Sequence, residues 1–173
     1  MIKIIDNFLD DDSFNNIKYF VDDPNLSWKR GKMLPEDLIV CDQKENFQDA
    51  HIIYCNGNYV KSELNFIIPI LKRLEAKVLL KAKINKTYPT QENLLVGWHT
   101  DTTEDHWASS KNPKTAIYYV NNNDGSTIIK EDEKEVVVNC VENRLVIFDT
   151  YLKHTAMTCS RSKYKLIINI NFY

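Results

Sequence analysis

The stretch KVLLKAKINKTY, residues 77–88, marks the point at which the hydrophobic pattern of the chain changes from helical to strand-like spacing. Residues 62–76, immediately before it, carry apolar side chains three and four positions apart, which is typical of an amphipathic helix. Short runs rich in β-branched and aromatic residues follow it, bounded by Asn, Asp, Gly or Pro: LLVGWHTD, TAIYYVN, STIIK, EVVVN, RLVIFDT and KLIININ. Such a series of short strands indicates an antiparallel sandwich or barrel.

The chain before this stretch is expected to be mainly helical. Residues 1–5 form a short apolar run that predicts a strand, and residues 11–22 have helical spacing after residues that can cap a helix. Residues 23–50 show little periodicity and indicate an irregular segment, with one short strand near residues 38–41. The second helix is expected to bend or break at Pro69. We therefore predict a β-rich α+β fold of the jelly-roll kind, with N-terminal helices packed outside it.

The length and composition are those of one globular domain. The chain has 173 residues, of which 43% are hydrophobic and 27% are charged, and this is enough to bury one sizeable core. We expect a single domain over residues 1–173, with a helical N-terminal part over residues 1–76 and a jelly-roll core over residues 77–173.

Several broad classes of protein are disfavoured. The first dozen residues are acidic and no stretch approaches about 18 consecutive apolar residues, so we expect a cytoplasmic protein with no membrane span. A formal net charge of -2 gives no clear signature of nucleic-acid binding. The four cysteines lie far apart without a C-x-x-C pair, which argues against a zinc ribbon and favours reduced thiols in the core.

A histidine two positions before an aspartate, in GWHTD (residues 97–101), is the first candidate for a metal site. With four histidines in the chain a chance His-x-Asp is not rare, so its surroundings must decide. Side chains two apart on a strand project from the same face, so His99 and Asp101 can reach one ion. His154, which follows the apolar run of residues 145–148, supplies a third ligand. Two imidazoles and one carboxylate form the ligand set of non-haem Fe(II) oxygenases, with three coordination positions left open.

The last run has one apolar face and one largely polar face. The apolar face consists of Leu166, Ile168, Ile170 and Phe172, and the polar face consists of Lys163, Lys165, Ile167, Asn169 and Asn171. If the apolar face packs against the helices, the polar face lines the interior of the barrel. A buried lysine needs an anionic partner, which an anionic co-substrate can supply. We therefore expect a co-substrate of this charge at the start of the last strand, where Lys163 lies nine residues after His154.

Four ordered motifs, YPTQENLLVGWHTD, TAIYYVN, NRLVIFDTYLKH and SKYKLIINI, resemble those of the 2-oxoglutarate and Fe(II)-dependent dioxygenases. The resemblance is to the prolyl-4-hydroxylase-like branch in particular, with its short phage and marine-bacterial members. It covers about residues 84–172 and implies a double-stranded β-helix, the cupin-like form of the jelly roll. It also implies that His99, Asp101 and His154 bind the iron and form the catalytic centre.

The same resemblance implies a site for the co-substrate. Lys163 corresponds to the basic residue that binds the far carboxylate of 2-oxoglutarate, Tyr119 to a tyrosine that assists it, and Tyr88 to a tyrosine beside the cofactor. Many relatives have Arg where this chain has Lys163, but lysine remains chemically adequate as a point charge. Arg161 is the alternative for this role, although its place in the turn before the last strand favours exposure to solvent.

A protein of this family uses Fe(II), 2-oxoglutarate and O2, with ascorbate as an auxiliary reductant, to hydroxylate an unactivated C–H bond, and releases succinate and CO2. By resemblance the substrate is a peptidyl proline, while another peptide or protein, a free amino acid or another small molecule also fits. Nucleic-acid dealkylation is a weaker alternative, because that branch shows two arginines after the distal histidine and this chain has Arg161 alone. The alternative from another class is a non-catalytic jelly-roll module, or a cupin-like metal protein, that retains the site.

Four further residues are assigned to structure or left between two interpretations. His51 is expected to be structural, and His106 to be an exposed loop residue in preference to a metal ligand. Trp98 and Trp107 either line the mouth of a substrate site or pack in the ordinary way. The sequence does not indicate the oligomeric state.

Overall fold

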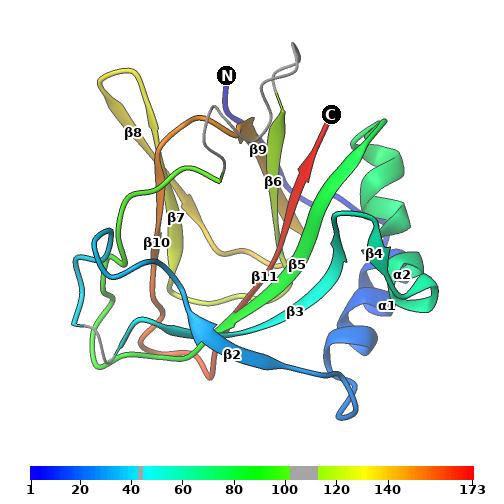
Figure 1. Ribbon diagram of the computed structural model, residues 1–173, viewed down its shortest axis with the longest axis horizontal. Helices are drawn as coiled ribbons and strands as arrows, with labels where there is room; N and C mark the ends of the chain where they lie inside the picture. The colour runs from blue at the N-terminus through cyan, green and yellow to red at the C-terminus, as the bar shows by residue number, and fades with distance from the viewer. Residues whose placement is uncertain (43–44, 102–112) are drawn as a thin grey trace.

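Two antiparallel sheets and two helices make up the computed structural model of the protein, which describes residues 1–42, 45–101 and 113–173 (Figure 1). In chain order the elements are β1 (Lys3–Ile5), α1 (Asp11–Val21), β2 (Lys29–Lys32), β3 (Phe47–Cys55), β4 (Asn58–Tyr59), α2 (Lys61–Arg73), β5 (Leu79–Thr87), β6 (Lys114–Tyr119), β7 (Ser126–Glu131), β8 (Lys134–Asn139), β9 (Arg144–Asp149), β10 (His154–Met157) and β11 (Lys165–Phe172). Within these residues the larger, eight-stranded sheet has the order β1-β9-β6-β11-β5-β3-β2, with β4 paired to β3, and the smaller sheet has the order β10-β7-β8.

The two sheets lie opposite each other, and both helices lie on the outer side of the larger sheet (Figure 1). Ile17 of α1 and Ile70 of α2 are fully buried in one core with Ile168 of β11. A second core contains Tyr119 of β6 and Ile129 of β7, and therefore joins the two sheets. The predicted jelly-roll fold with helices packed outside it is confirmed. Among the described residues, neither helix is long and apolar enough to cross a membrane.

Strand β11 lies in the middle of the larger sheet, between β5 and β6. Its apolar side chains, Leu166, Ile168, Ile170 and Phe172, all belong to the core that contains the helices. Lys165, Ile167 and Asn169, on the opposite face, line a cavity inside the barrel. The predicted division of this strand into a helix-facing and an interior-facing side is confirmed, because side chains alternate across a strand.

The N-terminal part contains more β-structure than its sequence suggests. Residues 38–41 form no strand, contrary to the prediction, because Leu38 donates its amide to the carbonyl oxygen of Pro35 and so closes a turn. Instead β2 and β3 add two strands to the larger sheet, with β3 paired to β5. The sequence predicted a bend or an interruption at Pro69, and since helix α2 continues through Pro69 the interruption is wrong.

Residues 94–99 run beside β10 but make only isolated pairings with it, at Leu95–Met157 and His99–His154. Gly97 separates the two pairings and has a φ of 154°. A side chain at Gly97 would collide with the backbone carbonyl of Leu38. The glycine therefore lets the loop over residues 33–42 pack directly against the segment that leads into His99.

Replacing Gly97 with alanine is expected to destabilise the protein by about 2 kcal/mol or more, because a Cβ there meets backbone atoms that cannot rotate away. Gly31→Ala is the matched control, since no atom lies within 4 Å of a Cβ built at Gly31. Chemical denaturation of both variants measures the difference. Equal stability of the two variants would contradict the tight contact at Gly97.

Candidate metal centre and its cavity

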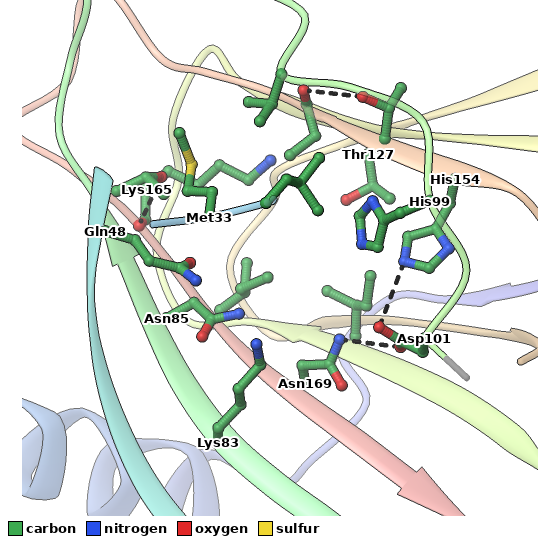
Figure 2. Close-up of a pocket in the computed structure, with 17 residues that line it drawn as sticks. Met33, Gln48, Lys83, Asn85, His99, Asp101, Thr127, His154, Lys165 and Asn169 are labelled. Carbon is green, nitrogen blue, oxygen red and sulfur yellow. Dashed lines mark hydrogen bonds and ion pairs between the residues drawn. The ribbon is translucent and has the colours of Figure 1, made fainter. Parts of the chain in front are cut away.

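A cavity lies between the two sheets, with a volume of about 660 Å³ when its open mouth is included (Figure 2). Its walls come from β5 and β11 of the larger sheet, from β7 and β10 of the smaller sheet, and from the segment before Asp101. Among the described residues, the charged side chains in the wall are Lys83, Asp101 and Lys165. His99 and His154 line the same cavity.

The structure brings His99, Asp101 and His154 together at one end of this cavity. Each side chain offers one ligand atom, and the three ligand atoms all lie within 4.8 Å of one another. The backbones of His99 and His154 pair through two hydrogen bonds, of 3.0 Å and 2.9 Å, and their ring centroids are 4.3 Å apart. The distance from Asp101 Oδ1 to His154 Nε2 is 3.7 Å. The two histidines are thus held side by side by main-chain hydrogen bonds.

The imidazole rings are oriented for ligation. His154 Nδ1 lies 3.1 Å from the carbonyl oxygen of Leu152, and since a carbonyl can only accept, Nδ1 carries the proton and Nε2 keeps its lone pair. The longer contact of His99 Nδ1 with the carbonyl oxygen of Gly97, at 3.5 Å, favours the same tautomer. Burial, together with the neighbouring His154, lowers the pKa of His99 to about 4. His99 is therefore neutral near pH 7, as a metal ligand must be.

The carboxylate of Asp101 is oriented by hydrogen bonds to one of its oxygens. Oδ2 accepts from the hydroxyl of Thr115 at 2.9 Å, from Nδ2 of Asn169 at 3.2 Å and from Nδ2 of Asn171 at 3.0 Å. Burial alone would raise the pKa of Asp101, but the neighbouring His154 and these amide donors hold that pKa at about 2. The carboxyl group is therefore ionised, and Oδ1 faces the histidines.

The lysine that reaches the cavity is Lys165 and not Lys163. Lys163 is exposed, and its ammonium lies 5.9 Å from the centroid of the Tyr164 ring. The predicted placement of Lys163 is corrected, because β11 begins two residues later than assumed and Lys163 lies in the bend before the strand. Arg161 is also exposed, as expected. Lys165 is 3% exposed, and its ammonium donates to the carbonyl oxygens of Ser126 and Met157.

The two tyrosines assigned to the co-substrate lie outside the cavity wall. Tyr119 is fully buried behind it in the second core, and burial raises its pKa. Its hydroxyl and that of Ser126 have no hydrogen-bond partner among the described residues. Tyr88 is 41% exposed and donates a hydrogen bond of 2.6 Å to Asp49.

The remaining candidates do not line the cavity or lie outside the described residues. His51 contacts the carbonyl oxygen of Ser27 and the carboxylate of Glu63 through its two ring nitrogens. Trp98 is half-buried, with the ammonium of Lys130 4.1 Å from its ring centroid. His106 and Trp107 lie outside the residues that the structure describes.

Sequence reasoning missed the polar side chains of β3 and β5 that line the cavity, namely Gln48, Lys83, Asn85 and Thr87. The sequence did contain a pattern that indicates the cavity-lining residues of β5. In KAKINKT, polar residues alternate with Ala82 and Ile84, which are both buried in the core that contains the helices. This is the same division into faces that predicted the interior side of β11.

The comparisons with known proteins support the fold. No family model matches the sequence, and no curated protein matches it. Solved structures do match. An oxidoreductase of the 2OG-Fe(II) oxygenase family from Burkholderia pseudomallei has a TM-score of 0.71 at 10% identity, over 99% of this chain and 84% of that one. The chain has the fold of the 2-oxoglutarate oxygenases.

Two further neighbours are prolyl hydroxylases. A prolyl-4-hydroxylase from Pseudomonas putida has a TM-score of 0.64 at 14% identity, over 99% of this chain and 91% of that chain. A prolyl hydroxylase from Trichoplax adhaerens, in complex with a peptide fragment of hypoxia inducible factor, has a TM-score of 0.68 at 12% identity, over 99% and 83%. At these identities the likeness establishes the fold, and the chemistry must be argued from the site.

Proposed function

We propose that this protein is a 2-oxoglutarate-dependent Fe(II) oxygenase that hydroxylates an unactivated C–H bond and releases succinate and CO2. The observation that carries the proposal is the convergence of two imidazoles and one oriented carboxylate at the end of a cavity that also contains a buried lysine. Nitrogen and oxygen donors in this two-to-one ratio suit Fe(II) and leave three coordination positions open. His99, Asp101 and His154 would hold the iron.

Lys165 takes the role first assigned to Lys163. Its buried ammonium has about three N–H donors, as any lysine does. Two of them donate to the carbonyl oxygens of Ser126 and Met157. The remaining donor lies beside the thiol of Cys140, a weak acceptor that the far carboxylate of 2-oxoglutarate can replace. The hydroxyls of Ser126 and Tyr119, which have no hydrogen-bond partner among the described residues, can assist. Tyr88, which is bonded to Asp49, keeps no direct role in this proposal.

The chain contributes ligation, orientation and exclusion of water. When bound, the iron supplies the site at which O2 is activated and the oxo-acid is decarboxylated. Leu152 fixes the tautomer of His154, and the donors on Asp101 Oδ2 leave Oδ1 for the metal. Val96, Ile117 and Ile167 give the cavity an apolar lining that limits the entry of water. By resemblance a peptidyl proline is one candidate for the oxidised group, and the peptide bound by the Trichoplax adhaerens neighbour supports that candidate.

Addition of Fe(II) and 2-oxoglutarate to the oxygen-free protein tests the proposal. The expected result is a weak visible absorption band from the chelate of metal and co-substrate, absent when either component is omitted. Folded protein that binds Fe(II) without this band would favour the alternative, a metal-binding module without the co-substrate. Consumption of 2-oxoglutarate on admission of O2, with release of succinate, then tests the reaction.

A further inference from the structure

Lys83 is a second lysine of the cavity, and the co-substrate does not account for it. It projects from β5 into the cavity, in the region where Asn85 and Asn169 also point inward (Figure 2). Asn169 is its register partner on β11. The ammonium of Lys83 makes no hydrogen bond or ion pair with any residue that the structure describes.

The net effect of the described residues around Lys83 is to disfavour its charged form. Burial lowers the pKa of Lys83, the neighbouring charge of Lys81 lowers it further, and the more distant Asp101 opposes both effects. Asp101 cannot serve as a dedicated partner, because its Oδ2 already accepts three hydrogen bonds and its Oδ1 faces the histidines. A buried cation without a partner costs free energy. Such a group in a cavity wall is explained if a ligand supplies the missing anion.

A count of charges indicates what that ligand carries. In the proposed enzyme, the two positive charges of Fe(II) and the one of Lys165 are balanced by Asp101 and by the two carboxylates of 2-oxoglutarate. Lys83 is then the one charged side chain of the described cavity wall without a counter-charge. One further negative charge would neutralise the site. Neither the described residues nor the metal nor the co-substrate would provide it, which leaves the molecule that is oxidised.

Two amide groups beside Lys83 add a second requirement. The side-chain oxygens of Asn85 and Asn169 are buried and have no hydrogen-bond partner among the described residues. The orientation of Asn169 is set by its Nδ2, which donates to Asp101, so its oxygen must act as an acceptor. A ligand that places N–H or O–H groups beside its carboxylate would satisfy these oxygens.

We propose that Lys83 binds a carboxylate of the substrate itself, and that the substrate is a small carboxylic acid with adjacent N–H or O–H groups, such as a free amino acid. This inference rests on the proposed oxygenase function and replaces an internal peptidyl residue as the substrate. An internal residue of a peptide has no carboxylate at its backbone, whereas a free amino acid has one beside its ammonium group.

The test uses [1-13C]propionate as a probe and its uncharged analogue [1-13C]propionamide. Both are added to oxygen-free protein loaded with Fe(II) and 2-oxoglutarate, and the paramagnetic relaxation of the 13C label is measured. Because the metal is paramagnetic, relaxation reports binding near it without any turnover. We expect enhanced relaxation of propionate and none of propionamide. In Lys83→Met the affinity for propionate should fall about ten- to a hundredfold.

Lys81→Met is the matched control, since Lys81 lies two residues away on β5 and does not line the cavity. It should bind propionate as the parent protein does. Lys83→Met should also raise the melting temperature of the ligand-free protein, because it removes an unpaired buried charge. A lower melting temperature for Lys83→Met than for Lys81→Met would overturn the proposal, since Lys83 would then be structural.

The visible band of the chelate separates this proposal from the proposed function. If the parent protein forms no band, the oxygenase function itself fails. If the band forms, and propionate relaxes equally in the parent protein and in Lys83→Met, the inference about the substrate fails alone. Loss of the band in Lys83→Met but not in Lys165→Met would also overturn it, because Lys83 would then bind 2-oxoglutarate.

Discussion

His154→Ala is expected to weaken Fe(II) binding by more than about a hundredfold, because loss of a group that only orients a ligand already costs ten- to a hundredfold. His154 is 3% exposed, lies beside His99 and packs against the ring of Phe148. Removing it deletes a ligand and leaves a small void, so some stability should be lost while the fold remains. Titration with Fe(II) under anaerobic conditions, with circular dichroism as the check on folding, measures both effects. His99→Ala and Asp101→Ala should lose the metal in the same way.

His51→Ala is the matched control for this prediction. His51 is also a buried histidine, but its ring contacts Ser27 and Glu63 and it does not line the cavity. Its removal should lower stability and leave Fe(II) affinity unchanged. If His154→Ala retained the affinity of the parent protein, His99, Asp101 and His154 would not be the metal site.

Lys165→Met is expected to weaken the binding of 2-oxoglutarate about ten- to a hundredfold and to leave Fe(II) affinity nearly unchanged. A charge-assisted hydrogen bond in a buried site contributes about 1.5–3 kcal/mol, which corresponds to this range. The measurement is a titration of the anaerobic Fe(II) protein with 2-oxoglutarate, followed through the visible band. Lys165→Arg should bind the co-substrate better than Lys165→Met, although the larger fork of arginine places its donors differently.

Two exposed cations near the start of β11 serve as controls for Lys165. Lys163→Met and Arg161→Met should both leave the affinity for 2-oxoglutarate unchanged, because neither side chain lines the cavity. Lys165 also bonds the carbonyl oxygens of Ser126 and Met157, so the melting temperature of Lys165→Met must be measured alongside. A loss of affinity in Lys163→Met that is absent in Lys165→Met would restore the original assignment.

The sequence predicted those parts of the fold that depend on local periodicity. The alternation in KLIININ identified both faces of β11, and the helical spacing of residues 11–22 matches α1, which begins after Asp10 accepts a hydrogen bond from the amide of Ser13. Strand β3 was missed because its pairing partner, β5, lies well beyond it in the chain and the interaction is non-local. The disruptive effect of Pro69 was overestimated. Burial of Ile67 and Ile70 stabilises a continuous helix, although proline cannot donate the backbone hydrogen bond.

The proposed metal ligands could be chosen from the sequence because their order and spacing resemble those of the 2-oxoglutarate oxygenases. The lysine that lines the cavity could not be chosen in this way. Lys163 and Lys165 are two positions apart, so the alternation of side chains along a strand assigns both to the interior face. Which of them lies inside depends on where β11 enters the sheet, and that is set by its pairing with Thr87 at the end of β5. A boundary of this kind is decided by tertiary contacts and has no local signal.

The hydrogen bonds to Asp101 have a consequence for the number of ligands that a metal can take from this protein. With Oδ2 occupied by Thr115, Asn169 and Asn171, the carboxylate has one oxygen to offer and cannot chelate through both. The protein would then fill three of six octahedral positions and no fourth. A bidentate oxo-acid would take two of the three that remain and would leave a single position for a further ligand. The three donors on one carboxylate oxygen would in this way keep Asp101 from closing that last position.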